Sequence, residues 1–168
     1  MKMLRLGLIL LIVFFEVIVG VSQVNVLKKI GPIKPAISSK SDVQQLLGEG
    51  VSNRDSVWYK FPGLSVEVIY SDGTCTQGWL ISRDKAVEVD VHFLDRRKLS
   101  QLKNNVNLTK LRPEKAVDVV GERYYSDDEN GVGYGVNEQD KTWFSTKHFP
   151  SSKFSNVRCG NRAPAPHM

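Results

Sequence analysis

The sequence predicts an α+β domain in which a short N-terminal helix packs on an antiparallel β-sheet, with a second short helix. Three observations lead to this class. Apolar and polar residues alternate in several runs, most regularly over 87–93, as they do on half-buried antiparallel strands. Turn-forming pairs such as Pro62-Gly63 separate these runs. Residues 41–48 instead place their apolar side chains at helical spacing.

The chain begins with a segment typical of a secretory signal peptide, residues 1–22. A positively charged start and an apolar run over 6–15 are followed by small residues that fit cleavage after Ser22. The run is shorter than the about 20 apolar residues of a membrane span, and Glu16 follows it. We therefore expect a secreted or periplasmic protein with no stable membrane span after cleavage. Retention as an N-terminal membrane anchor is the alternative.

The remaining chain divides into a lead-in segment at 23–40, a single α+β domain at 41–160 and a disordered tail at 161–168. The sequence carries 23 basic and 18 acidic side chains, for a net charge of +5, without a dense basic cluster. Nucleic-acid binding is not expected, because it needs a concentrated basic surface or a recognisable module. The expected partner is another envelope or secreted protein.

The first helix is predicted over 41–48. Ser41 and Gln44 fit a capping box, and Gly48 is suited to end the helix. One helical face carries the apolar side chains of Val43, Leu46 and Leu47. This narrow apolar stripe needs a surface to pack on, which the predicted sheet supplies.

Four strands are predicted next, over 56–61, 64–70, 74–81 and 87–93. The pair Asp72-Gly73 is a strong hairpin signal between the second and third of them. A second short helix is predicted within 95–102 through Leu99 and Leu102, and 103–118 is expected to be irregular. The last strands are predicted over 122–125, 132–136 and 142–149, the first two joined by the acidic turn 127–131.

The two cysteines, Cys75 and Cys159, lie in the predicted mature chain. An even pair in a small exported domain indicates a disulfide, which here ties an early strand to the C-terminal end. Two buried free thiols and a redox pair are the alternatives. A redox pair favours close spacing such as C-x-x-C, which is not the spacing here.

Residues 30–93 resemble the helix-then-sheet unit of the SmpA/OmlA outer-membrane proteins and of β-lactamase inhibitor protein. The resemblance lies in the Asp42-to-Gly48 helix, the aromatic strand at 57–61 and the strand that ends at Tyr70. It implies a helix packed on an antiparallel sheet. The chain departs from both families, because it lacks the lipobox cysteine of the SmpA type and shows one copy of a unit that the inhibitor protein carries twice.

The whole pattern also resembles a family of uncharacterised secreted bacterial proteins. The shared features are the segment from Ile30 to Gly48, the strand end from Tyr70 to Cys75, the hairpin from Tyr124 to Tyr134, and Pro150-Ser151 with Cys159. This resemblance implies a bacterial origin, the fold and the disulfide, and it implies no activity.

No catalytic residue, metal site or cofactor is predicted. His92 and His148 lie on candidate strands and His167 in the tail, which leaves them scattered, whereas a metal site needs three or four convergent ligands. The acidic turn at 127–131 lacks the spacing of a calcium loop, and no serine or cysteine lies in a nucleophile motif.

Large aromatic side chains supply the candidate binding surface, for which we single out Trp58, Trp79 and Trp143. Filling the core of a small sheet is the other use of such residues. We predict an exported, non-catalytic domain that binds another macromolecule or belongs to the cell envelope. A small extracytoplasmic hydrolase is the alternative.

Overall fold

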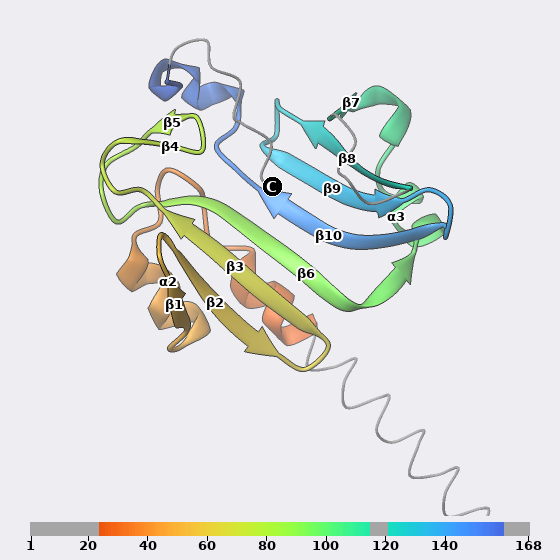
Figure 1. Ribbon diagram of the computed structural model, residues 1–168, viewed down its shortest axis with the longest axis horizontal. Coiled ribbons are helices and arrows are strands. Elements are labelled where there is room, and N and C mark those ends of the chain that lie inside the picture. Colours follow the sequence, from red (N-terminus) through yellow and green to blue (C-terminus); the bar gives the residue numbers. More distant parts are fainter. Residues whose placement is uncertain (1–23, 115–120, 160–168) are drawn as a thin grey trace, which may run out of the picture.

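The computed structural model describes residues 24–114 and 121–159. Eight strands form one antiparallel sheet (Figure 1) in the order β1-β2-β3-β6-β10-β9-β8-β7. In that order the strands are Val51–Asn53, Ser56–Phe61, Leu64–Tyr70, Ala86–Lys98, Thr142–His148, Val132–Asn137, Glu122–Asp127 and Arg112–Pro113. The protein is thus α+β, as predicted, with more sheet than helix. The predicted signal peptide and the tail at 161–168 lie outside the described residues.

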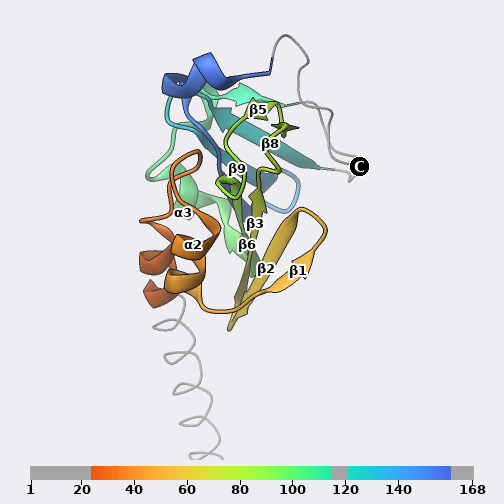
Figure 2. The same cartoon turned by 90° about the vertical axis from the view of Figure 1, so that its left-hand side faces the viewer.

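The helices lie on one side of this sheet (Figure 2). They are α2 (Lys40–Leu47) and α3 (Leu99–Lys103), preceded by helical residues 24–30 in the predicted lead-in, which the sequence pattern did not reveal. Two 3-10 helices follow, η1 (Leu108–Lys110) and η2 (Ser152–Val157). Among the described residues no helix is long and apolar enough to cross a membrane.

Helix α2 confirms the first predicted helix, but its cap differs from the prediction. The N-cap is Ser39, whose side chain accepts a hydrogen bond from the Asp42 amide at 3.2 Å, while the Asp42 carboxylate accepts one from the Ser39 amide at 2.7 Å. The capping box therefore starts two residues before the predicted Ser41. An aspartate at the third helical position serves as well as the glutamine that the pattern suggested, because its carboxylate satisfies the same orphan amide.

The larger core lies between these helices and the first half of the sheet. Alternate residues of β3 and β6 face the helices and are buried, among them Leu64, Val66, Val68, Val89 and Val91. Helix α2 contributes Val43 and Leu47, and the helical lead-in contributes Val26 and Ile30. A smaller cluster below the second half of the sheet joins Leu99, Leu102 and Leu108 to Val136. Both clusters hold the helices to the same face.

The predicted hairpin at Asp72-Gly73 is wrong. Strand β3 pairs with β2 and β6, and the segment after it forms a separate two-stranded ladder of β4 (Cys75–Thr76) and β5 (Trp79–Leu80). The Asp72 carboxylate accepts hydrogen bonds from the Thr74 amide at 2.7 Å and its hydroxyl at 2.6 Å. Asp72 therefore stabilises a loop, since a side chain that bonds its own backbone two residues on offers an alternative to a hairpin turn.

The disulfide prediction is confirmed: Cys75 and Cys159 are bonded, with their Cα atoms 5.9 Å apart. The bond joins β4 to the segment after η2. The same two segments are also held by a hydrogen bond from the Cys159 amide to the Gly78 carbonyl at 3.0 Å, and by the Arg158 guanidinium, 4.7 Å from the centre of the Trp79 ring.

The remaining predicted elements are present with shifted boundaries. The strand at 87–93 extends through β6 to Lys98, and the second helix follows it directly as α3. The hairpin of β8 and β9 and the last strand, β10, are confirmed, and Gly131 takes the positive φ that the turn requires, at 68°. The stretch predicted to be irregular contains η1 and β7.

Candidate functional site

The face of the sheet that carries no helix is polar along its centre. The strand register places Glu67, Asp90 and Lys147 in one row across β3, β6 and β10, and Ser65, His92 and Ser145 in the next row. This surface, the polar face, comprises Trp58, Ser65, Glu67, Glu88, Asp90, His92, Tyr124, Phe144, Ser145 and Lys147. These residues come from five strands, so the register of the sheet is what assembles them.

Asp90 lies at the centre of the polar face and is only 7% exposed. Its Oδ1 atom has no hydrogen-bond partner. Burial raises the pKa of this carboxyl to about 6, an effect that His92 and Lys147 oppose and that Glu88 and Glu67 reinforce. A carboxylate that is buried and incompletely bonded is unusual and points to a binding or catalytic role.

Lys147 provides the main positive charge beside Asp90. Its Nζ lies 2.9 Å from Glu88 Oε1 and 4.0 Å from Asp90 Oδ2. Burial by itself would lower the pKa of this amine, but the two carboxylates outweigh it and raise the pKa. Lys147 is therefore a charged counterion committed mostly to Glu88, so Asp90 is only partly neutralised.

His92 lies between Asp90 and Trp58. The imidazole stacks on the Trp58 indole, with ring centroids 5.5 Å apart and planes inclined by 20°. Its Nε2 is 3.7 Å from Asp90 Oδ2, beyond hydrogen-bond distance, and this buried nitrogen has no hydrogen-bond partner. Trp58 is half-buried and lies directly across from Glu67 on β3. The accessible part of the polar face is thus an aromatic pair beside a carboxylate.

Ser145 lies opposite His92 on β10 and is fully buried, and its Oγ has no hydrogen bond. Gly135 on β9 faces it. A Cβ atom at Gly135 would meet Ser145 Oγ at 2.5 Å and the Phe144 ring at 2.7 Å. The Phe144 ring in turn contacts Tyr124 edge-on, with centroids 5.7 Å apart. These aromatic side chains therefore cover the serine on the β9 side.

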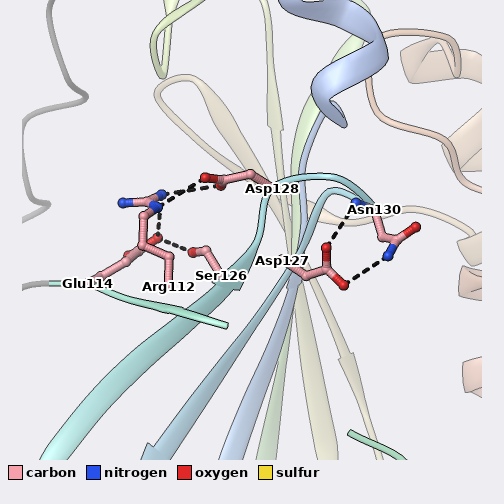
Figure 3. Close-up of polar contacts among 6 residues, drawn as sticks. All are labelled: Arg112, Glu114, Ser126, Asp127, Asp128 and Asn130. Carbon is pink, nitrogen blue, oxygen red and sulfur yellow. Dashed lines mark hydrogen bonds and ion pairs between the residues drawn. The ribbon is translucent and has the colours of Figure 1, made fainter. Parts of the chain in front are cut away.

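A group of polar contacts borders this face at the β8–β9 turn (Figure 3). The Arg112 guanidinium donates to both oxygens of Asp128, at 3.0 and 3.2 Å, and the Ser126 hydroxyl donates to Glu114. Asp127 accepts hydrogen bonds from the backbone and side-chain nitrogens of Asn130, at 3.1 and 2.9 Å. The acidic residues of this turn therefore hold β7 against the hairpin and shape the turn.

The three tryptophans of the predicted binding surface do not lie together. Trp58 is on the polar face, whereas Trp79 belongs to β5 and is buried at 6% exposure against Ile81 and Val87. Trp143 is on the helix side, where it contacts the Phe93 ring edge-on at 4.9 Å between centroids. Trp58 is thus the one member of this group that lies on the polar face.

The two histidines on the candidate strands lie on opposite faces of the sheet. His92 belongs to the polar face, whereas His148 lies in register with Val89 on the opposite side of the sheet, where burial lowers its pKa. His148 is therefore not part of the polar face. No group of three or more His, Cys, Asp or Glu side chains within residues 24–114 and 121–159 is arranged to hold a metal ion.

Glu67, Asp90, Ser145 and Lys147 were not identified from the sequence as members of one site. The alternation at 88, 90 and 92 was visible, but the pairing of β6 with β10 was not, because about 50 residues separate them in the chain. Comparisons of the chain with protein-family models, with curated proteins and with solved structures find no match. Its function must therefore be inferred from its own side chains.

Proposed function

We propose that the protein is an exported, non-catalytic module that binds another secreted or envelope macromolecule through its polar face. The observation that carries the proposal is the buried Asp90 with an unpartnered oxygen, beside the half-exposed Trp58 and Glu67. Buried polar atoms are normally satisfied, and each exception needs a water, an ion or a ligand to account for it.

Export is supported by two features. The first 22 residues have the pattern of a signal peptide. The Cys75–Cys159 disulfide is of the kind that persists in oxidising compartments outside the cytoplasm. The two features together support the proposal of a secreted or periplasmic location, with retention of the leader as an anchor as the alternative.

The charges of the polar face favour a partner that presents a cationic side chain. The face carries three carboxylates, those of Glu67, Glu88 and Asp90, and one committed ammonium group, that of Lys147, which contacts Glu88 and Asp90. Glu67 forms no ion pair with any other described residue. A lysine or arginine of the partner that lies against the Trp58 ring gains a cation–π contact and the charge of Glu67 at once.

A binding role accounts for these residues better than hydrolysis does. Ser145 and His92 face each other with Asp90 nearby, which superficially resembles the set that serine hydrolases use. A nucleophile must reach its substrate and lie within hydrogen-bond distance of its base. Ser145 is 0% exposed and its Oγ forms no hydrogen bond to His92. Ser145 is therefore unsuited to act as the nucleophile of the rival hydrolase hypothesis.

The test starts from the immobilised exported protein, which is used to capture partners from the extracytoplasmic fraction of its source. Each candidate is purified and titrated against wild type, Trp58→Ala, Glu67→Gln and the control Glu49→Gln, which removes an exposed carboxylate outside the polar face. We expect the Trp58 and Glu67 variants to weaken binding by about fivefold or more, since each loses a contact of about 1 kcal/mol. The control variant should bind like wild type.

Two results would contradict the proposal. One is that no purified partner distinguishes the Trp58 and Glu67 variants from the control. The other is turnover of an ester, peptide or glycoside substrate by the wild-type protein that Ser145→Ala abolishes, which would favour the hydrolase hypothesis instead.

A further inference from the structure

A hollow lies on the helix side of the sheet, away from the polar face. It is an open pocket of about 580 Å³, lined by residues of α3, the segment through η1, strand β8 and the loop between β9 and β10. Its lining includes Leu99, Lys103, Val106, Leu108, Tyr125 and Lys141. The volume falls in the range of roughly 300–1,000 Å³ that is typical of small-molecule sites.

One part of the lining is apolar. Leu99 and Leu108 are buried members of the smaller core cluster, and Val106 and Tyr125 pack against that cluster while remaining half-buried. These side chains therefore offer an ordered apolar wall that an alkyl or aromatic group can cover. Burying such a group stabilises the complex by about 25 cal/mol per Å² of apolar surface removed from water.

The other part of the lining carries an excess of positive charge. Lys103 and Lys141 are exposed, and neither forms an ion pair with another described residue. Glu138, the acidic residue of the lining, is already engaged, because Arg123 Nε lies 3.4 Å from its Oε2 and the Tyr125 hydroxyl donates to its Oε1. Two unpaired ammonium groups beside one pocket repel each other, and a bound anion relieves this repulsion.

We propose that this pocket binds a small amphiphilic anion, namely a carboxylate with an apolar tail of medium length. The tail covers Leu99, Val106 and Leu108, and the carboxylate interacts with Lys103 and Lys141. The site is independent of the proposed function, because it lies on the opposite side of the sheet and shares no residue with the polar face.

The experiment titrates the ¹⁵N-labelled full-length exported protein with decanoate, below the concentration at which it forms micelles, and follows the amide resonances. We expect saturable shifts confined to residues 99–109 and the neighbourhood of Tyr125 and Lys141. The double variant Lys103→Gln/Lys141→Gln should weaken decanoate binding about tenfold. The control Lys29→Gln/Lys153→Gln, which removes the same charge from two exposed lysines elsewhere, should bind like wild type.

Two further arms test the two halves of the proposed ligand. Decanol, which has the tail without the charge, should bind wild type about tenfold more weakly than decanoate does. Its affinity for the double variant should equal its affinity for wild type. Val106→Trp should fill the pocket and abolish the shifts. The proposal is overturned if decanoate gives no saturable shifts, if the shifts map to the polar face, or if decanol and decanoate bind alike.

Discussion

The two faces of the sheet are built from the same strands but differ in composition: one is apolar and covered by helices, and the other is polar and carries no helix. On the helix side, Val66, Val68, Val89 and Val91 are almost fully buried, and helices cover them. Glu67 and Asp90 lie on the same two strands but point to the polar face. No helix covers them there, and Asp90 Oδ1 is buried without a hydrogen bond. The comparison shows where stability resides: the helix side can account for the fold, which leaves the polar face available for binding.

Buried polar atoms without partners gather on the second of these faces. Asp90 Oδ1, His92 Nε2 and Ser145 Oγ all lie there, on two adjacent strands. Each such atom costs about 1–3 kcal/mol relative to a satisfied one. A protein retains such a cost where it serves a function, because local rules of stability are commonly broken at functional sites.

The largest expected effect is on the free energy of unfolding, and it compares two adjacent residues that lie on opposite faces of the sheet. Leu64→Ala removes a fully buried side chain from the larger core and should lower the free energy of unfolding by about 3 kcal/mol. Ser65→Ala, one residue on and on the polar face, should change it by less than about 0.5 kcal/mol. Urea unfolding followed by circular dichroism measures both. Similar losses for the two variants would contradict the assignment of stability to the helix side.

The next effect concerns the pH dependence of stability that Asp90 causes. Its pKa is about 6 in the folded protein and about 3.9 in an unfolded chain, so the folded state binds the proton more tightly. Its contribution to stability is therefore complete below about pH 4 and is lost as the pH rises to about 6. Asp90→Asn should match wild type at pH 4 and exceed its unfolding free energy by about 2 kcal/mol at pH 7.5.

The matched control for this measurement is Asp95→Asn, because Asp95 lies on the same strand and is exposed. Asp95→Asn removes an exposed carboxylate and is measured at the same two pH values as the reference for Asp90→Asn. An Asp90→Asn difference that does not change between pH 4 and pH 7.5 would mean that the Asp90 carboxyl is better solvated than its burial indicates.

Sequence patterns predicted the elements whose signals are local and missed those that depend on distant pairing. The alternation over 87–93 identified the central strand because a half-buried strand places apolar and polar side chains alternately on its two faces. The pair Asp72-Gly73 led to a wrong prediction because it suits both a hairpin turn and a loop held by the Asp72 side chain. The pairing of β3 with β2 and β6 decides for the loop, and the local sequence does not show that pairing.

The candidate site was predicted less completely for the same reason. His92 and Asp90 were recognisable as neighbours on one strand face, but their neighbours Trp58 and Lys147 come from two other strands. A one-residue change in the register of β10 would have turned Lys147 and Ser145 to the helix side. No local pattern in 142–149 fixes that register, and the bulge between Trp143 and Ser145 helps to set it.

The smallest expected effect tests how tightly the polar face is packed, using two glycines of the same strand. Gly135→Ala places a methyl group 2.5 Å from Ser145 Oγ and 2.7 Å from the Phe144 ring, so it should destabilise the protein by about 1–2 kcal/mol. Gly133→Ala meets no atom closer than 3.7 Å and should be neutral or slightly stabilising, since glycine weakens a strand. Thermal unfolding measures both. If Gly135→Ala is also neutral, Phe144 and Ser145 can move apart. Ser145 is then accessible to a substrate, and this result favours the hydrolase hypothesis.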